Sequence, residues 1–104
     1  MTDKNRIVNV HMTFRNIEGT DAIKTYVVDK VTHCVQKFAH KDTDARVVLS
    51  VERNPQIAEL NVRYDGHDIH AKEERGDLYA AVDALIDTVT QQLRKHKEKA
   101  SSHH

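Results

Sequence analysis

The spacing of apolar residues switches between two periods along this chain, and the order of these switches limits the folds that it can adopt. From Ile7 to Phe14, apolar and polar residues alternate, which is typical of a strand with one buried face. From Asp21 to about Phe38, apolar residues recur every three or four positions, which predicts one buried helix face with Thr20 as the N-cap.

The second half of the chain predicts three more strands and a long helix. Alternation returns in three runs: residues 47–51, 58–64 and 67–73. Asn54-Pro55 marks the first turn between them, and Asp65-Gly66 is typical of a two-residue hairpin turn whose central residues both need positive φ. Helical spacing then resumes at Gly76-Asp77 and continues to about Lys99.

This order, β-α-β-β-β-α, predicts an α+β fold with a four-stranded mixed sheet. Both helices can bury their apolar faces only by lying on one face of that sheet. The first two strands are joined through a helix, so we expect them to be parallel with a right-handed crossover, and the rest to form an antiparallel meander. With 104 residues we expect one domain over residues 1–100 and a short disordered tail at 101–104, whose histidines could be a cloning remnant.

Charge and cysteine content restrict the class of protein. Sixteen basic and sixteen acidic residues give a formal net charge of zero with neutral histidines, so any affinity for nucleic acid must come from local segregation of charge. The single cysteine, Cys34, excludes an internal disulfide and fits a reducing compartment. No apolar run reaches membrane-spanning length, and the polar start lacks signal-peptide character. We therefore expect a cytoplasmic protein.

Basic residues gather at two places. At the end of the second predicted helix, two glutamines that can donate to phosphate or sugar oxygens precede four basic residues: Gln91, Gln92, Arg94, Lys95, Lys97 and Lys99. On the first predicted helix, Lys30, His33 and Lys37 form a row beside the buried seam. Basic residues at a helix C-terminus also complement the helix macrodipole, so the pattern alone does not separate RNA binding from helix stabilisation.

The remaining candidates for chemistry favour structural roles. Asp83 and Asp87 lie one turn apart and could hold Mg²⁺, but no third ligand is evident. His67 and His70 point to opposite faces of a strand because their spacing is odd. Cys34 lies on an apolar helix seam, and no base is evident beside it. The open sheet face carries no aromatic residue to stack bases, which excludes a single-strand reader of the RRM kind. We predict no enzyme activity, no metal site and no cofactor.

Three stretches of the second half carry a resemblance to a known family: LNVRYDGHDIHA at 60–71, DLYAAVDALID at 77–87 and QLRKHKEK at 92–99. They resemble the short hibernation promoting factor and ribosome-associated inhibitor A family, also called the sigma-54 modulation protein family. The most specific element is the run from Tyr79 to Asp83. The N-terminal half matches the family by its pattern of elements more than by motif.

The resemblance implies a fold similar to a double-stranded RNA-binding domain. It also implies that the protein is a non-catalytic inhibitor of translation. Members lie between head and body of the small ribosomal subunit, in the decoding channel, and exclude mRNA and tRNA in stationary phase or stress. By carry-over, Arg94, Lys95 and Lys97 would contact rRNA, with Lys30 and Lys37 as secondary contacts. The partners would be the small subunit, intact ribosomes or ribosome dimers. The end of the chain soon after Lys99 favours the short promoting type over the inhibitor A type.

Two other interpretations stay open at this point. A protein-interaction module that acts on a sigma factor would bind its partner with little salt dependence and would ignore ribosomes. A metal-dependent RNA-processing enzyme centred on Asp83 and Asp87 would cleave RNA and lose that activity with a chelator. Docking through phosphates predicts a steep salt dependence instead.

Overall fold

The structure of the protein, a computed structural model, describes residues 7–53 and 55–101, with side chains of the last helix described as far as Lys97. Its elements follow in order: β1 (Val8–Arg15), α1 (Asp21–Gln36), β2 (Thr43–Val51), β3 (Gln56–Tyr64), β4 (His67–Arg75) and α2 (Leu78–Ser101). The predicted β-α-β-β-β-α order is therefore confirmed. The predicted tail overlaps α2 at Ser101, and its remaining residues, 102–104, lie outside the described part of the chain.

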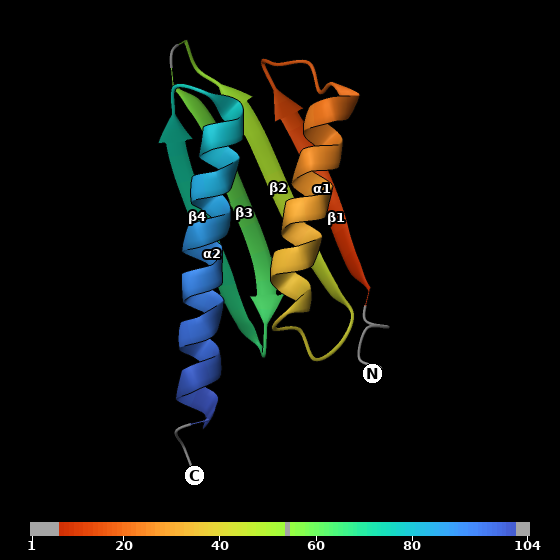
Figure 1. Cartoon of the computed structure of the whole chain (residues 1–104), viewed down its shortest axis with the longest axis vertical. Helices are drawn as coiled ribbons and strands as arrows, with labels where there is room; N and C mark the ends of the chain where they lie inside the picture. The colour runs from red at the N-terminus through yellow and green to blue at the C-terminus, as the bar shows by residue number, and fades with distance from the viewer. Residues whose placement is uncertain (1–6, 54, 102–104) are drawn as a thin grey trace.

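The four strands form one sheet in the order β1-β2-β3-β4, and both helices cover the same face of it (Figure 1). β1 and β2 are parallel, with Val8 opposite Thr43, and the other two pairs are antiparallel. The hairpin between β3 and β4 turns through Asp65 (φ 51°) and Gly66 (φ 79°). Both predictions, the mixed sheet and the turn with two positive φ angles, are confirmed.

The prediction placed the start of β2 four residues too late. Residues 43–46 look like a loop in the sequence because Thr43 and Asp44 are polar, but they lie against β1. The N–H of Thr43 donates to the carbonyl of Ile7 (2.9 Å), and Nδ2 of Asn9 donates to Oδ1 of Asp44 (3.1 Å). Pairing with a neighbouring strand therefore extends β2 beyond its apolar run.

β4 is longer than predicted for a related reason. Glu73 faces the helices at a position where an apolar residue would continue the alternation, and the strand still runs to Arg75. The hydroxyl of Thr88 on α2 donates to Oε2 of Glu73 (2.7 Å), and Nη1 of Arg75 lies 3.1 Å from its other oxygen. The half-buried carboxylate is thus paired, as burial requires.

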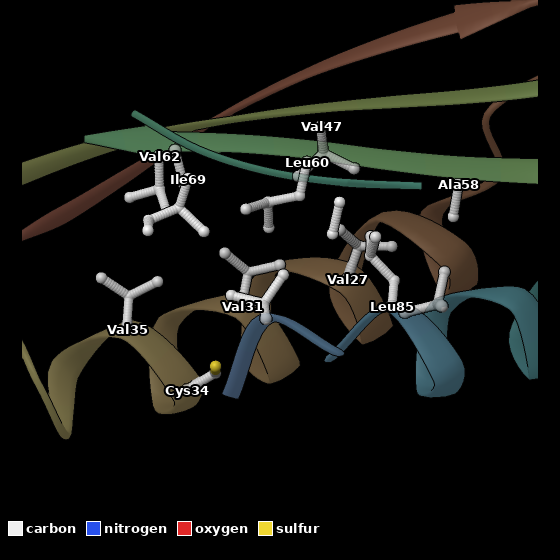
Figure 2. Packing of buried hydrophobic residues seen from close by; sticks show 14 of the residues in the cluster. Val27, Val31, Cys34, Val35, Val47, Ala58, Leu60, Val62, Ile69 and Leu85 are labelled. Atoms are coloured by element: carbon white, nitrogen blue, oxygen red, sulfur yellow. The ribbon is translucent and has the colours of Figure 1, made fainter. Parts of the chain in front are cut away.

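One continuous apolar core fills the space between the sheet and the two helices (Figure 2). Val27 and Val31 of α1 and Leu85 of α2 have no exposed surface, and they face Val47 and Leu60 of the sheet. Burying side chains of this size stabilises the fold by about 1.5–3 kcal/mol each relative to leaving them exposed. The core therefore rests on aliphatic residues.

Both helices begin with the caps that their sequences favour. The N–H of Ile23 donates to Oγ1 of Thr20 (3.3 Å), which confirms the predicted N-cap of α1. The N–H of Ala80 donates to Oδ2 of Asp77 (3.0 Å) at the start of α2. Cys34 belongs to the core, as expected; burial raises the pKa of its thiol, and Sγ lies 3.2 Å from Oγ1 of Thr90.

α2 extends past the end of the sheet. Its 24 residues span about 36 Å, whereas a nine-residue strand such as β4 spans about 30 Å. Because α2 starts close to the end of β4 and runs back along it, the surplus length projects beyond the β3–β4 hairpin, as the blue end in Figure 1 shows. The surplus of about 6 Å corresponds to about the last four residues of the helix, and Leu93 before them is still buried.

Candidate nucleic-acid interface

The C-terminal part of α2 carries the cluster of positive charge that the sequence predicts. Arg94, Lys95 and Lys97 are all exposed there, level with the β3–β4 hairpin, and we call these three residues the basic end. Leu93, immediately before them, is the last fully buried residue of the helix seam. The backbone of Lys99 lies in α2, but its side chain lies outside the described residues.

The basic end meets the C-terminal end of α1. Nζ of Lys97 lies 5.9 Å from the centre of the Phe38 ring, within the range of a cation–π contact. Phe38 follows directly after Lys37, which is exposed and forms no hydrogen bond or ion pair with the described residues. The two predicted basic regions are therefore neighbours in space, although about 60 residues of sequence separate them.

A groove runs between the two helices beside this end. Its volume is about 400 Å³, and it is lined by Asp29, Lys30, His33, Cys34, Lys37, Ile86 and Thr90. All three members of the predicted α1 row line it. The sequence did not predict that Ile86 and Thr90 line this groove, because only the relative placement of the helices brings them opposite that row.

The two predicted glutamines differ in their surroundings. Gln91 is exposed beside the basic end. Gln92 is half-buried, and its Nε2 donates to the backbone carbonyl of His70 (3.4 Å), which ties α2 to β4. Gln91 is thus the one positioned to donate to an RNA oxygen, and Gln92 already has a partner within the fold.

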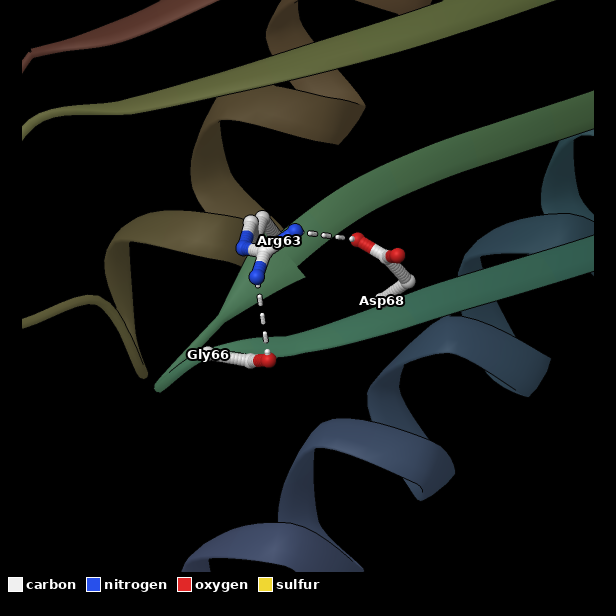
Figure 3. Close-up of polar contacts among 3 residues, drawn as sticks. All are labelled: Arg63, Gly66 and Asp68. Carbon is white, nitrogen blue, oxygen red and sulfur yellow. Dashed lines mark hydrogen bonds and ion pairs between the residues drawn. The ribbon is translucent and has the colours of Figure 1, made fainter.

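The opposite face of the sheet is charged but balanced. A hollow of about 350 Å³ on this face is lined by Asp44, Arg46, Asn61, Val62, Arg63 and Asp68. Arg63 donates to Asp68 (3.2 Å) and to the carbonyl of Gly66 (3.4 Å), as Figure 3 shows. Two arginines and two aspartates cancel in formal charge. Among the described residues, the strand positions on this face carry no aromatic side chain.

Two histidines on this sheet face lie beside carboxylates, whose charge a protonated imidazole would neutralise. Nε2 of His11 lies 3.6 Å from Asp44, and Nε2 of His70 lies 3.5 Å from Glu59. The cations gathered at the C-terminal ends of the two helices, Lys37, Arg94, Lys95 and Lys97, therefore have no counterpart among the described residues of this sheet face.

The structure gives the catalytic and metal candidates other roles. Oδ1 of Asp83 accepts a hydrogen bond from the hydroxyl of Tyr26, and Asp87 forms no hydrogen bond or ion pair with the described residues. His67 stacks against α2, whereas His70 lies on the open sheet face, so the two rings point to opposite faces as predicted. Within residues 7–53 and 55–101, no three potential metal ligands gather at one place.

No helix within this described part is long and apolar enough to span a bilayer.

The Tyr26–Asp83 hydrogen bond joins the two helices and accounts for the aspartate of the Tyr79–Asp83 run. The Tyr26 ring also packs edge-on against Tyr79, with ring centres 4.9 Å apart, and Nζ of Lys30 lies 5.3 Å from it. The hydrogen bond, and secondarily desolvation, raise the pKa of Tyr26. A raised pKa in the folded state means that this stabilisation is present below pH 10 and is lost as pH rises further.

We expect Tyr26→Phe or Asp83→Asn to lower the free energy of unfolding by about 0.5–1 kcal/mol, because an exposed hydrogen bond to a carboxylate contributes less than a buried one. Urea denaturation at pH 7 measures the difference. Asp87→Asn is the matched control, since Asp87 lies one turn along the same helix without such a bond. Equal stabilities for Asp83→Asn and Asp87→Asn would contradict the role of this contact.

Comparison with known proteins agrees with this arrangement. Residues 10–101 match the family described as sigma 54 modulation protein / S30EA ribosomal protein. The ribosome hibernation promoting factor of Klebsiella oxytoca is 38% identical over 96 residues, which cover 92% of this chain and 100% of the relative. The factor of the same name from Escherichia coli K12 is 35% identical with the same coverage.

Two solved structures resemble the fold. The N-terminal domain of Thermus thermophilus Protein Y matches with a TM-score of 0.76 and 31% identity, covering 85% of this chain and 98% of that one. A ribosomal subunit interface protein from Coxiella burnetii matches with a TM-score of 0.77 over 86% of this chain and 98% of that one. Its identity is 22%, so this second likeness supports the fold alone.

Proposed function

Because the chain belongs to the sigma 54 modulation protein / S30EA ribosomal protein family, we propose that it binds the small ribosomal subunit through rRNA phosphates and holds ribosomes inactive. Proteins of this family are non-enzymatic binding proteins, and the relatives named above are ribosome hibernation factors. A role in ribosome hibernation follows for this chain, and we propose that it acts in the cytoplasm, where its ribosome partner lies.

The observation that carries this proposal is the position of the basic end. Arg94, Lys95 and Lys97 are exposed on the last turns of α2, level with the β3–β4 hairpin, in a chain of zero formal net charge. Cations spaced around the end of a helix can approach phosphates from several directions, which suits a passage walled by RNA better than a flat surface. Lys30 and Lys37 along the α1 groove extend the same positive surface. We include Gln91 and Lys99 as further contacts, and Gln92 through the amide hydrogen that its bond to His70 leaves unused.

Occupying the decoding channel is sufficient to inhibit translation. We propose that the domain sits in the decoding channel between the head and body of the small subunit, where it excludes mRNA and tRNA in stationary phase or stress. Such a mechanism needs no catalytic group, cofactor or metal ion. We also propose that binding promotes pairing of ribosomes.

A sucrose-gradient experiment at several salt concentrations tests the proposal. The protein is expected to sediment with small subunits and with intact ribosomes at low salt. If four to six phosphates are neutralised, raising salt from 50 to 200 mM should weaken binding by about 100- to 2000-fold. A protein that stays at the top of the gradient at 50 mM salt would contradict ribosome binding, and a profile with bound monosomes but no dimers would contradict ribosome pairing.

The family description also names modulation of sigma 54, which keeps a protein-interaction function as the alternative. Such a module would bind its transcription factor with little salt dependence and would leave the ribosome profile unchanged. The gradient experiment therefore separates the two functions, since only one of them predicts co-sedimentation that disappears with salt.

A further inference from the structure

Two histidines from different elements meet beside the basic end. His67 is the first residue of β4, and His96 lies on α2 between Lys95 and Lys97. Their ring centres are 4.9 Å apart, and the ring planes are tilted by 36°. His67 is exposed and His96 is half-buried, so both rings are accessible to solvent. We call these two residues the histidine pair.

The charged groups on the elements around the pair are mostly cationic. At the end of α1 and in the loop after it they are His33, Lys37, His40, Lys41 and Asp42, and on the β3–β4 hairpin they are Arg63, Asp65 and Asp68. On α2 they are Arg94, Lys95 and Lys97, followed in the sequence by Glu98 and Lys99, whose side chains lie outside the described residues. Asp68 already pairs with Arg63 (3.2 Å), so Asp65 is the other carboxylate on the hairpin. His40 lies against Tyr64, with ring centres 5.8 Å apart. A proton taken up by the pair would therefore add to a positive region.

Histidine is the side chain that ordinarily changes charge between pH 8 and pH 5. This chain contains eight histidines and has zero formal net charge when they are neutral, so protonating all of them would give it a net charge of +8. Four of them, His33, His40, His67 and His96, lie at the end of the molecule that carries the basic end. The distribution links proton uptake to the proposed RNA-binding surface.

We propose that the histidine pair makes the affinity of the basic end for RNA phosphates rise as pH falls below neutrality. The inference rests on the proposed function and adds a regulation to it. A phosphate that lies on the basic end favours the protonated form of a nearby imidazole, because opposite charges attract. The two equilibria are linked. RNA binding favours protonation of the pair, and protonation of the pair therefore raises the affinity for RNA by the same factor.

The test measures dissociation constants for isolated small ribosomal subunits at pH 8.0 and pH 6.0, both at 0.1 M salt. One additional neutralised phosphate changes the binding constant by about eightfold at this salt concentration. The wild-type protein is therefore expected to bind about eightfold more tightly at pH 6.0. The variant His67→Gln/His96→Gln is expected to keep its pH 8.0 affinity and to lose most of this change. His96→Lys, which carries a permanent charge, is expected to bind tightly at both pH values.

The matched control is His11→Gln/His70→Gln. These two histidines lie on the open sheet face beside Asp44 and Glu59, away from the basic end. The control removes the same number of ionisable rings and is expected to keep the full pH response. Loss of the response in this control, or its retention in the His67→Gln/His96→Gln variant, would overturn the inference. A wild-type affinity that is equal at both pH values would do the same, whereas no binding at either pH would refute the proposed function itself.

Discussion

Reversing the charge of the basic end, with Arg94, Lys95 and Lys97 all replaced by glutamate, is expected to abolish co-sedimentation with small ribosomal subunits. Loss of three phosphate contacts alone should weaken binding by about 500-fold at 0.1 M salt. Glutamates facing phosphates add repulsion to that loss. The fold should survive, because all three side chains are exposed and none belongs to the core.

The control is a second triple variant, which makes the same change in net charge on the opposite face of the molecule. Arg15, Arg46 and Lys72 lie on the open sheet face, and their replacement by glutamate is expected to weaken binding far less. Circular dichroism and thermal melting establish that both variants are folded. Equal loss of binding in the two triple variants would mean that net charge, and not the basic end, determines affinity.

Leu85→Ala is expected to lower the free energy of unfolding by about 3 kcal/mol. Leu85 has no exposed surface and lies where α2 meets α1 and the sheet (Figure 2), so truncation removes apolar contacts and leaves a cavity. That loss is a large fraction of the stability that a domain of this size ordinarily has. The measurement is urea denaturation at pH 7.

Asp87→Ala is the control for Leu85→Ala on the same helix. Asp87 is exposed, and its replacement is expected to change stability by less than about 0.5 kcal/mol. If Leu85→Ala lowered the stability by less than 1 kcal/mol, the position assigned to Leu85 at the centre of the core would be wrong.

The fold could be predicted from the sequence because its local signals agree with each other. Alternation indicated each strand, and Asp65-Gly66 and Thr20 fixed a turn and a cap that the structure confirms. The start of β2 was missed because polar residues there owe their strand conformation to β1, which lies 35 positions earlier in the sequence. Pairing over such a distance leaves no trace in local periodicity.

The candidate site could be predicted only in part. Arg94, Lys95 and Lys97 were identified because they are close together in sequence and follow an amphipathic seam. The contacts of Tyr26 with Asp83 and of His67 with His96 join residues 57 and 29 positions apart. They depend on how α2 lies against α1 and the hairpin, and no spacing rule indicates that placement.

The parallel pairing of β1 imposes an order on events during synthesis. β1 emerges from the ribosome before the other strands, and within residues 7–53 and 55–101 it pairs with β2 alone, at one edge of the sheet. Each residue of β1 can pair only after the chain has grown by 35 further residues, because Val8 lies opposite Thr43 and Arg15 lies opposite Ser50. The β2–β3–β4 meander needs only short connections, so it can form as soon as it is free of the exit tunnel. The first strand to be made can thus complete the sheet only by joining a strand that is made later.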